Sequence, residues 1–215
     1  FRGSLTLCGY GEPMLHNQIY EISKKLANVS FVEIVTNGDT LTKKVISNLY
    51  DSNVNKLLIS MYDGPEQEAH FQNIIDQVEL GDSKVILRKR WLPPEEHYGI
   101  TLNNRAGLVN LPQIGVIPLV ESLKRPCFYP FYEVLVDYDG AVLLCPHDWR
   151  KKLIVGNLND QTIHDLWDSN VLKRVRRNLS NGDRNFAPCN ECDVDGTLMG
   201  KAHFDGWNDY YAGRS

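Results

Sequence analysis

Apolar residues in the first hundred positions recur in two alternating patterns. Short apolar runs, typical of buried strands, occur at 4–8, 31–38, 56–64 and 84–92. Between these runs lie segments whose apolar residues recur every three or four positions, as on one face of a helix: 16–28, 41–53 and 65–79. Strands that alternate with helices form right-handed βαβ units around a parallel sheet. The pattern predicts an α/β fold with ligand chemistry at the carboxyl ends of its strands.

The pattern changes near residue 100, where prolines become frequent. The segment 131–145 then reads as two short strands around the turn dipeptide Asp139-Gly140, which predicts a hairpin. A short strand and one long amphipathic helix follow in 152–179, with Thr162 as the expected N-cap. The tail after residue 195 shows no clear pattern. We expect two domains, 1–112 and 113–215.

Composition and charge narrow the classes of partner. The 215 residues are 42% hydrophobic, enough to bury a core, and carry a net charge of -4. This charge gives no reason to expect a nucleic acid or an anionic membrane as partner. A basic run occurs within the long helical pattern, and we expect it to be a solvated face: Lys173, Arg174, Arg176 and Arg177.

Four of the five cysteines form a constellation. Cys127 and Cys145 flank the predicted hairpin, and Cys189 and Cys192 form the CxxC of "PCNEC". Disulfides would need an oxidising compartment, and the chain shows no signal peptide. Zinc accepts four thiolates but is usually held by two CxxC pairs, whereas an iron–sulfur cluster accepts thiolates from scattered positions. Spacing alone does not rank the cluster above zinc. Cys8 is expected to be a small buried apolar residue.

Several motifs resemble those of radical SAM enzymes that end in a SPASM/twitch region. The cysteine hairpin with Gly140, the segment "GNLNDQTIHDLW" and "PCNEC" resemble that region, while "CGYGEPMLH" resembles the glycine-rich GGEP motif after the second barrel strand. The cysteine layout is similar to the branch with one auxiliary [4Fe–4S] cluster. The resemblance covers nearly the whole chain and ranks an iron–sulfur cluster on the four cysteines first. It implies a partial (β/α)6 TIM-like barrel lacking its first unit, followed by a small α+β SPASM/twitch domain.

The resemblance also implies a site for S-adenosylmethionine (SAM). In the family the "GYGEP" turn binds the amino group of SAM through backbone oxygens, supported by the glutamate, and the glycines let backbone approach a ligand closely. Ser60, with Arg88 or Arg90, could hold the SAM carboxylate by charge-assisted hydrogen bonds. Strand alternation sends both arginines to one face and does not choose between them. The implied cofactor-binding residues are Gly9, Tyr10, Gly11, Glu12, Pro13, Asn37, Ser60 and Arg88.

Other polar residues are candidates for contact with a substrate. The loop "NNRAG" resembles one that faces the active site in the family, and its Arg105 is the candidate catalytic residue, because a guanidinium clamps a hydroxyl or carboxylate with fixed geometry. The alternative is an arginine that stabilises its own loop. His147 and Asp148 could relay a proton or hydrogen-bond around the cluster, or form an ordinary polar pair at a strand end.

The CxxxCxxC motif that defines the family is absent, and it would precede 4–8. Either an N-terminal segment is missing from this chain, or the chain is a degenerate relative that is inactive as it stands.

With a second [4Fe–4S] cluster on absent residues, the resemblance implies an oxidoreductase. An electron donor such as flavodoxin or ferredoxin would drive cleavage of SAM to a 5′-deoxyadenosyl radical, which takes hydrogen from a small polar substrate, a sugar or aminocyclitol, and the auxiliary cluster accepts an electron. Alternatives are a peptide-modifying enzyme, a non-catalytic iron–sulfur or zinc module, and a redox carrier. Oxygen sensitivity of the cluster implies a cytoplasmic location.

Overall fold

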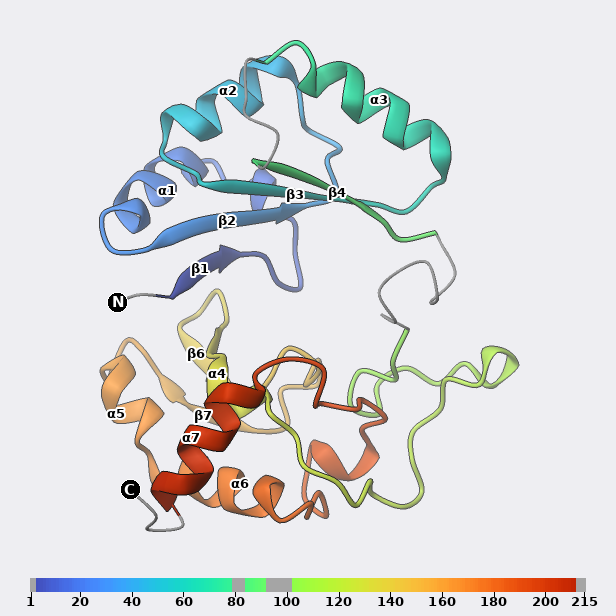
Figure 1. Ribbon diagram of the computed structural model, residues 1–215, viewed down its shortest axis with the longest axis vertical. Helices are drawn as coiled ribbons and strands as arrows, with labels where there is room; N and C mark the ends of the chain where they lie inside the picture. The colour runs from blue at the N-terminus through green and yellow to red at the C-terminus, as the bar shows by residue number, and fades with distance from the viewer. Residues whose placement is uncertain (1–2, 79–83, 92–101, 212–215) are drawn as a thin grey trace. The chain divides into compact units, whose positions relative to one another are not determined.

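The computed structural model describes residues 3–78, 84–91 and 102–211. The chain divides into two compact units, Phe1–Thr101 and Leu102–Ser215, each with its own hydrophobic core (Figure 1). The boundary expected after residue 112 lies inside the second unit. Two of the predicted elements end outside the described residues, at Glu79 and at Leu92.

A parallel sheet with strand order β1-β2-β3-β4 forms the first unit, as the alternating pattern predicted. Its strands are β1 (Ser4–Leu7), β2 (Phe31–Thr36), β3 (Lys56–Met61) and β4 (Val85–Lys89). After Lys56, every residue of β3 is buried, because this strand has neighbours on both sides and packs on both faces. β1 lies at the edge of the described sheet and is partly exposed.

Amphipathic helices cover one face of this sheet (Figure 1). They are α1 (Ile19–Ala27), α2 (Lys43–Asp51) and α3 (Pro65–Ile75), with a short 3₁₀ helix, η1 (Pro13–Leu15), before α1. The Thr42 hydroxyl caps α2 by accepting from the Val45 N–H, and Pro65 opens α3 as expected. Ile46 and Leu49 of α2 are fully buried in the core, each stabilising the unit by about 2 kcal/mol through burial.

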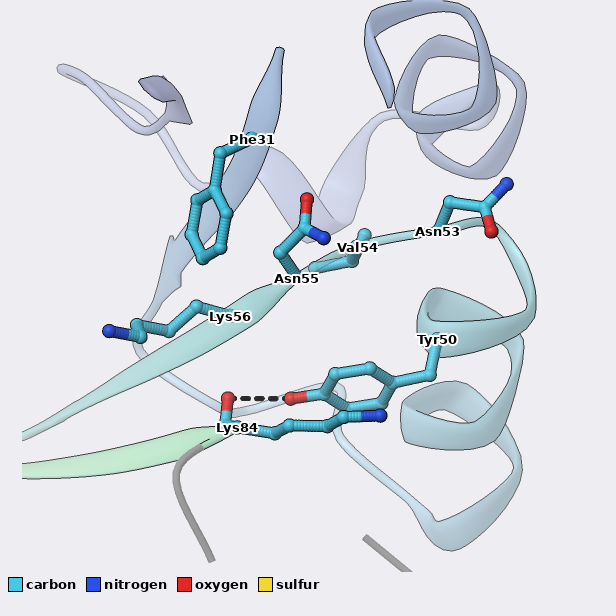
Figure 2. Close-up of a pocket in the computed structure, with 7 residues that line it drawn as sticks. All are labelled: Phe31, Tyr50, Asn53, Val54, Asn55, Lys56 and Lys84. Carbon is cyan, nitrogen blue, oxygen red and sulfur yellow. Dashed lines mark hydrogen bonds between the residues drawn. The ribbon is translucent and has the colours of Figure 1, made fainter. Parts of the chain in front are cut away.

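A pocket of about 520 Å³ opens at the amino ends of β2 and β3 (Figure 2). Its walls include Phe31, Tyr50, Lys56 and Lys84, and the Tyr50 hydroxyl donates to the Lys84 carbonyl at 2.6 Å. Ligand chemistry in parallel sheets collects at the opposite, carboxyl ends of the strands. None of the expected site residues lines this pocket.

The second unit is built around a small antiparallel sheet with strand order β5-β6-β7. The strands are β5 (Leu135–Val136), β6 (Ala141–Leu143) and β7 (Ile154–Asn157). The predicted hairpin is confirmed: β5 and β6 pair around the turn at Asp139-Gly140, where Gly140 has a φ of 84°. The helical segments are η3 (Pro112–Ile114), α4 (Tyr129–Tyr132), α5 (Ile163–Trp167), α6 (Asn170–Ser180), η4 (Cys189–Glu191) and α7 (Lys201–Tyr211).

The structure corrects two predictions about the long helix. The segment forms two helices, α5 and α6, because Ser169 turns out of helical geometry and caps α6 through the Leu172 N–H. Thr162 caps α5, as predicted, in a reciprocal capping box with Asp165. The basic run is not wholly a solvated face, since Arg176 is fully buried and lies 3.9 Å from the centre of the Trp167 ring.

The described part of the tail that showed no sequence pattern, up to Tyr211, also has a defined structure. It forms α7, and Phe204 of this helix packs on Phe128 and Phe131 of the core. In the described part of the chain, no helix combines the length and apolarity needed to cross a membrane.

Candidate iron–sulfur and cofactor sites

The "GYGEP" turn joins the carboxyl ends of β1 and β2 through the carboxylate of Glu12. One oxygen of Glu12 accepts hydrogen bonds from the Met14 N–H at 2.9 Å and the Thr36 hydroxyl at 2.7 Å. The other oxygen accepts from the Asn37 N–H at 2.9 Å. A carboxylate that accepts three such bonds fixes both strand ends. The Glu12 carboxylate therefore holds the turn against the end of β2.

The two glycines of this turn leave room beside the backbone. Gly9 has a φ of 139°, a conformation that favours glycine. A Cβ atom built on Gly9 or on Gly11 would meet nothing within 4 Å. A ligand could therefore approach the backbone closely at both positions. This space fits the role expected of the turn, which is to bind the amino group of SAM through backbone oxygens. Tyr10, between them, is exposed, and Pro13 begins η1.

A polar group lies on the sheet face opposite the helices. Ser60 pairs in register with Arg88, so both side chains project from this same face, and Glu33 lies on it by strand alternation. Ser60 is buried, and burial, followed by the charge of Arg90, lowers the pKa of the Arg88 guanidinium, while the charge of Glu33 raises it. Arg88 is thus a partly desolvated cation beside a serine hydroxyl, a pair suited to a carboxylate ligand.

Arg90 lies in the turn after β4, where its N–H donates to the Met61 carbonyl at 2.8 Å. Arg88 lies within the strand and is held there by the ladder to β3. The backbone of each arginine is therefore held against β3, and both remain candidates for the SAM carboxylate.

Cys8 does not have the environment expected from the sequence. It is exposed, because it follows the partly exposed strand β1 and leaves the sheet there. The expectation of a buried apolar residue was wrong.

The second unit gathers the other four cysteines from three separated segments. Cys127 precedes α4, Cys145 follows β6, Cys189 is the first residue of η4, and Cys192 follows η4. Cys189 and Cys192 are buried, and no disulfide joins any two of the five cysteines, all of which lie in the described ranges. The sulfur atoms are close enough that ionisation of one thiol opposes ionisation of the others.

Burial dominates the electrostatics of these thiols. It raises the pKa of Cys145 well above its usual value, and the neighbouring Cys189 and Cys127 raise it further. Burial also raises the pKa of Cys127 and of Cys189, and it brings the pKa of Cys192 to about 11. Four thiolates cannot be buried together without compensating positive charge. A metal centre supplies such charge, so the donor set fits a thiolate-ligated cluster.

The arrangement of the four cysteine thiols distinguishes a single metal ion from a four-iron cluster. Within the described ranges, no three His, Cys, Asp or Glu side chains are grouped as ligands of a single metal ion. A single zinc needs its thiolates converging at about 2.3 Å from one atom. A four-iron cluster does not need its thiolates to converge on one atom, because each thiolate binds a different iron of the cluster.

Arg184 holds the backbone of the cysteine site together. It is 2% exposed, and its guanidinium donates to four carbonyl oxygens: Arg125 at 2.9 Å, Pro126 at 2.6 Å, Val194 at 2.7 Å and Asp195 at 2.6 Å. The first two residues precede Cys127 and the last two follow Cys192. The fork of five N–H donors thus joins the two ends of the site. Its charge also lowers the pKa of the thiols of Cys127, Cys189 and Cys192 against the larger effect of burial.

Gly196 packs directly against the first cysteine. A Cβ atom built on Gly196 would lie 2.5 Å from Sγ of Cys127 and 3.0 Å from Nη2 of Arg184. Its carbonyl accepts from the Phe128 N–H at 2.7 Å, and its φ is 79°. Glycine is required here by both conformation and space.

The loop of Arg105 has an unusual backbone. Arg105, Ala106 and Gly107 all have positive φ, at 49°, 52° and 85°. Two non-glycine residues in this region cost free energy that surrounding contacts must offset. The Arg105 guanidinium lies 4.7 Å from the centre of the Trp149 ring, so the strained loop presents a cation at a defined position.

His147 and Asp148 follow Cys145 and differ in their contacts. Both ring nitrogens of His147 are buried and have no hydrogen-bond partner among the described residues. Burial and the charge of Arg105 lower the pKa of His147 to about 4, so its ring is neutral. The carboxylate of Asp148 instead accepts from the backbone N–H groups of Lys152 and Leu153, at 3.0 and 2.9 Å, and shapes the loop after the cysteine.

Several residues that shape the site were not predicted individually from the sequence. Arg184 and Gly196 stand in polar, loop-like stretches where a surface arginine and a turn glycine are expected. Thr36 and Asn104 are buried polar residues, at 2% and 0% exposure, and only their buried hydrogen bonds distinguish them.

Comparison with known proteins finds a family that matches the segment carrying the four cysteines. Residues 127–193, which begin at the first cysteine of the site and end just after the last, match the family described as SPASM, iron–sulfur cluster-binding domain. The cysteine segment of the second unit is therefore similar to a SPASM domain, and the resemblance to radical SAM enzymes with such a domain is confirmed.

A particular relative covers most of the chain. The chain is 26% identical over 197 residues to S-adenosyl-L-methionine-dependent 2-deoxy-scyllo-inosamine dehydrogenase of Niallia circulans, covering 90% of this chain and 74% of that protein. The crystal structure of BtrN in complex with AdoMet and 2-DOIA shares the fold, with a TM-score of 0.72, 24% identity, and coverage of 91% of this chain and 74% of that one. SeMet BtrN in an open conformation matches at a TM-score of 0.63 and 21% identity, covering 89% and 71%.

Proposed function

We propose that this chain belongs to a radical SAM oxidoreductase that dehydrogenates a small polar substrate of the sugar or aminocyclitol class. Its strongest support is the set of four cysteines, which three separated segments bring together in a buried site within a SPASM domain. The similarity to an aminocyclitol dehydrogenase over 90% of the chain favours a small-molecule substrate over a peptide.

The auxiliary site consists of Cys127, Cys145, Cys189 and Cys192, which would hold one [4Fe–4S] cluster. When bound, such a cluster would supply a one-electron acceptor. The protein itself contributes burial, which keeps water from the sulfur atoms, and the Arg184 cation, which partly offsets the negative charge of the thiolates. A cluster of this kind suits a reducing compartment, in keeping with a cytoplasmic location.

The first unit would bind SAM on a partial (β/α)6 barrel. The open backbone at Gly9 to Gly11 would accept the amino group, with Glu12 holding the turn against Asn37. Ser60 and Arg88 would bind the carboxylate from the neighbouring strands. Tyr10 and Pro13 belong to the same turn and would complete its shape.

Arg105 and His147 would contact the substrate in the second unit. Removing a hydrogen atom, a proton and an electron converts an alcohol to a ketone, so a neutral base near the hydroxyl group is useful. The buried imidazole of His147 is neutral and has unpaired ring nitrogens, and Arg105 lies near it as a cation. Arg105 would orient a substrate hydroxyl, and an unpaired ring nitrogen of His147 would accept a hydrogen bond from it.

The radical step needs a further cluster. The chain has one cysteine before Cys127, whereas a CxxxCxxC site supplies three. The proposed reaction therefore requires a CxxxCxxC segment from residues outside these 215, together with an electron donor such as flavodoxin or ferredoxin. Such an extended protein should produce 5′-deoxyadenosine from SAM.

Anaerobic reconstitution followed by metal analysis tests the auxiliary site directly. The chain should take up iron and sulfide at about four of each, the content of a [4Fe–4S] centre. Cys189→Ala should lower the iron content, and Cys8→Ala serves as the matched control because Cys8 lies outside the constellation. Stoichiometric zinc in place of iron, or an iron content that Cys189→Ala leaves unchanged, would contradict the assignment.

A further inference from the structure

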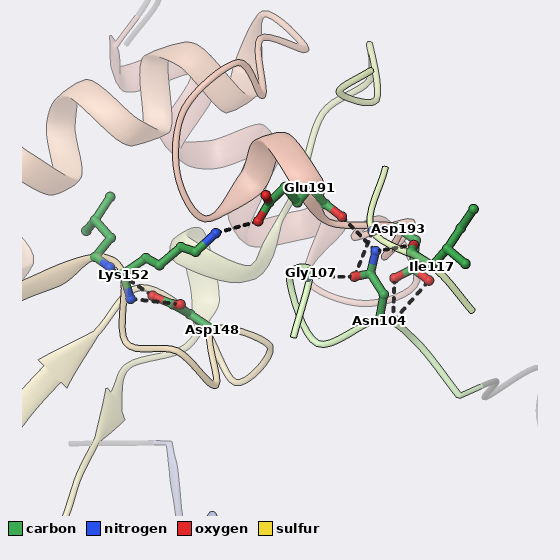
Figure 3. Close-up of polar contacts among 8 residues, drawn as sticks. Asn104, Gly107, Ile117, Asp148, Lys152, Glu191 and Asp193 are labelled. Atoms are coloured by element: carbon green, nitrogen blue, oxygen red, sulfur yellow. Dashed lines mark hydrogen bonds and ion pairs between the residues drawn. The ribbon is translucent and has the colours of Figure 1, made fainter. Parts of the chain in front are cut away.

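One buried amide side chain holds the Arg105 loop on the cysteine turn of the second unit (Figure 3). Asn104 is fully buried, and its Nδ2 donates to the Glu191 carbonyl at 2.6 Å and to the Ile117 carbonyl at 2.9 Å. Its Oδ1 accepts from the Gly107 N–H at 3.1 Å. Because both amide hydrogens and the oxygen are used, the side chain has one orientation and joins three backbone segments.

The backbone of Asn104 makes a second connection, to the residue that follows Cys192. Its N–H donates to both carboxylate oxygens of Asp193, each at 3.0 Å, and the Asp193 N–H approaches Oδ1 of Asn104 at 3.4 Å. Asn104 and Asp193 therefore bind each other reciprocally. Glu191 lies between the two cysteines of the CxxC and Asp193 lies just beyond them, so Asn104 contacts both sides of Cys192.

The strained part of the loop also rests on this turn. A Cβ atom built on Gly107 would lie 2.6 Å from Oε2 of Glu191, so the loop backbone is in close contact with the Glu191 side chain. Lys152 forms an ion pair with the same carboxylate and holds it in place (Figure 3). The positive φ angles at Arg105 and Ala106 persist only where neighbours fix them. Here the neighbours belong to the segment that carries Cys189 and Cys192.

We propose that Asn104 is a positioning residue that couples the Arg105 loop to the cysteines, so that occupation of Cys189 and Cys192 by a cluster holds Arg105 in its substrate-contacting conformation. This coupling rests on the proposed function of the site. A purely structural asparagine would stabilise the loop equally with and without the cluster. Coupling through Glu191 and Asp193 makes the order of the loop depend on whether the cysteines are ligated.

Trypsin cleavage after Arg105 measures the order of the loop at the residue in question. The chain is prepared with and without its reconstituted iron–sulfur cluster, and the peptide ending at Arg105 is quantified over time by mass spectrometry. Loading should slow this cleavage by about tenfold in the native chain, the effect of stabilising a loop by one to two buried hydrogen bonds. In Asn104→Asp the slowing should fall below about twofold, because a carboxylate cannot donate to the two carbonyls and faces Asp193.

Asn110→Asp provides the matched control. It makes the same chemical change six positions later in the same segment, at an exposed residue, and should keep the native response to loading. Asp193→Asn is a second variant that keeps the shape of the partner and removes its charge. In this variant the slowing of cleavage on cluster loading should be about threefold smaller than in the native chain, because the hydrogen bond from the Asn104 N–H is weaker.

Iron and sulfide are measured on every sample. These measurements separate the test of the Asn104 coupling from the test of the cluster assignment. A native chain that binds iron but cleaves equally fast with and without it, or variants protected as well as the native chain, would overturn the coupling and leave the cluster assignment standing. A native chain that takes up no iron would overturn both. Loss of protection in Asp193→Asn at unchanged iron content supports the coupling even where Asn104→Asp fails to fold.

Discussion

Arg184 shows how a single side chain can assemble a site from distant segments. Its four hydrogen bonds span from the residues just before Cys127 to those just after Cys192. A lysine could retain the charge but not the four bonds, since its ammonium has three donors at one point. The two properties of the arginine, geometry and charge, can therefore be separated by substitution.

We expect Arg184→Lys and Arg184→Gln each to lower the free energy of unfolding by about 3 kcal/mol or more, because buried carbonyls lose their donors. Arg184→Gln should also shift the midpoint potential of the reconstituted cluster to a more negative value. A nearby cation stabilises the reduced, more negative form, and glutamine removes it. Urea unfolding and a redox titration measure the two effects.

Arg174→Gln is the control for charge alone, since Arg174 is exposed on α6. It should leave the stability and the potential close to their native values. Equal shifts of potential in Arg174→Gln and Arg184→Gln would show that Arg184 has no special effect on the cluster.

At the level of elements, the cysteine site depends on irregular segments that pack tightly on the helices and the hairpin. Cys189 belongs to the core of α4 to α7, while Cys127 is confined by the turn at Gly196. The carboxyl-terminal helix contributes to this packing through Phe204. The elements fix the distances between the cysteines, and the turns fix the direction in which each sulfur atom points.

Two glycine-to-alanine substitutions distinguish these contributions. Gly196→Ala should destabilise the chain by about 2 kcal/mol and lower its iron content, because the new methyl group would collide with Sγ of Cys127 and the positive φ disfavours alanine. Gly206→Ala, within α7, meets nothing within 4 Å and should stabilise the chain by about 0.5–1 kcal/mol. Iron analysis and thermal unfolding compare the two variants.

Normal iron uptake by Gly196→Ala would argue against Cys127 as a ligand. It would mean that displacing this sulfur atom does not disturb the site. A loss of iron in Gly206→Ala would mean that any change in the second unit impairs loading.

At the level of the whole molecule, the proposed chemistry is divided between two units with separate hydrophobic cores. The expected SAM residues belong to the first unit and the four cysteines to the second. A ligand that binds only the folded form stabilises the cooperative unit that holds it.

Cluster loading should therefore protect the second unit selectively. We expect amide hydrogen exchange in 127–145 and 189–196 to slow by about tenfold or more on reconstitution, while amides of β2 and β3 change little. Exchange measured by mass spectrometry on loaded and unloaded samples gives both values at once. Equal slowing in both units would show that they unfold as one cooperative body.

The sequence determined the regular elements well, because their signals are local. The parallel sheet followed from apolar runs that alternate with amphipathic segments, and the hairpin followed from Asp139-Gly140 between two short strands. The N-cap at Thr162 and the first helical residue of α3, Pro65, were also readable, since a helix start depends on a few adjacent residues. The division of the long helix was missed because Ser169 reads equally well as a polar residue on a helix surface.

The four cysteines could be named from the sequence because thiols are rare and their spacing is distinctive. The residues that surround and position these cysteines could not be named from the sequence. Arginines 176 and 184 read as surface cations, yet both are buried, and each donates hydrogen bonds to carbonyl groups of other segments. Asn104 could not be told from Asn103 beside it, although only Asn104 is fully buried.

The sequence by itself thus determined which residues can ligate, cap and form strands, since those properties belong to side chains and their near neighbours. Only the tertiary structure decided which polar groups leave water, because burial depends on segments that meet from far apart in the chain. That decision gives the cysteine site its surroundings: a cation at Arg184, a close glycine at Gly196, and a strained loop held by Asn104.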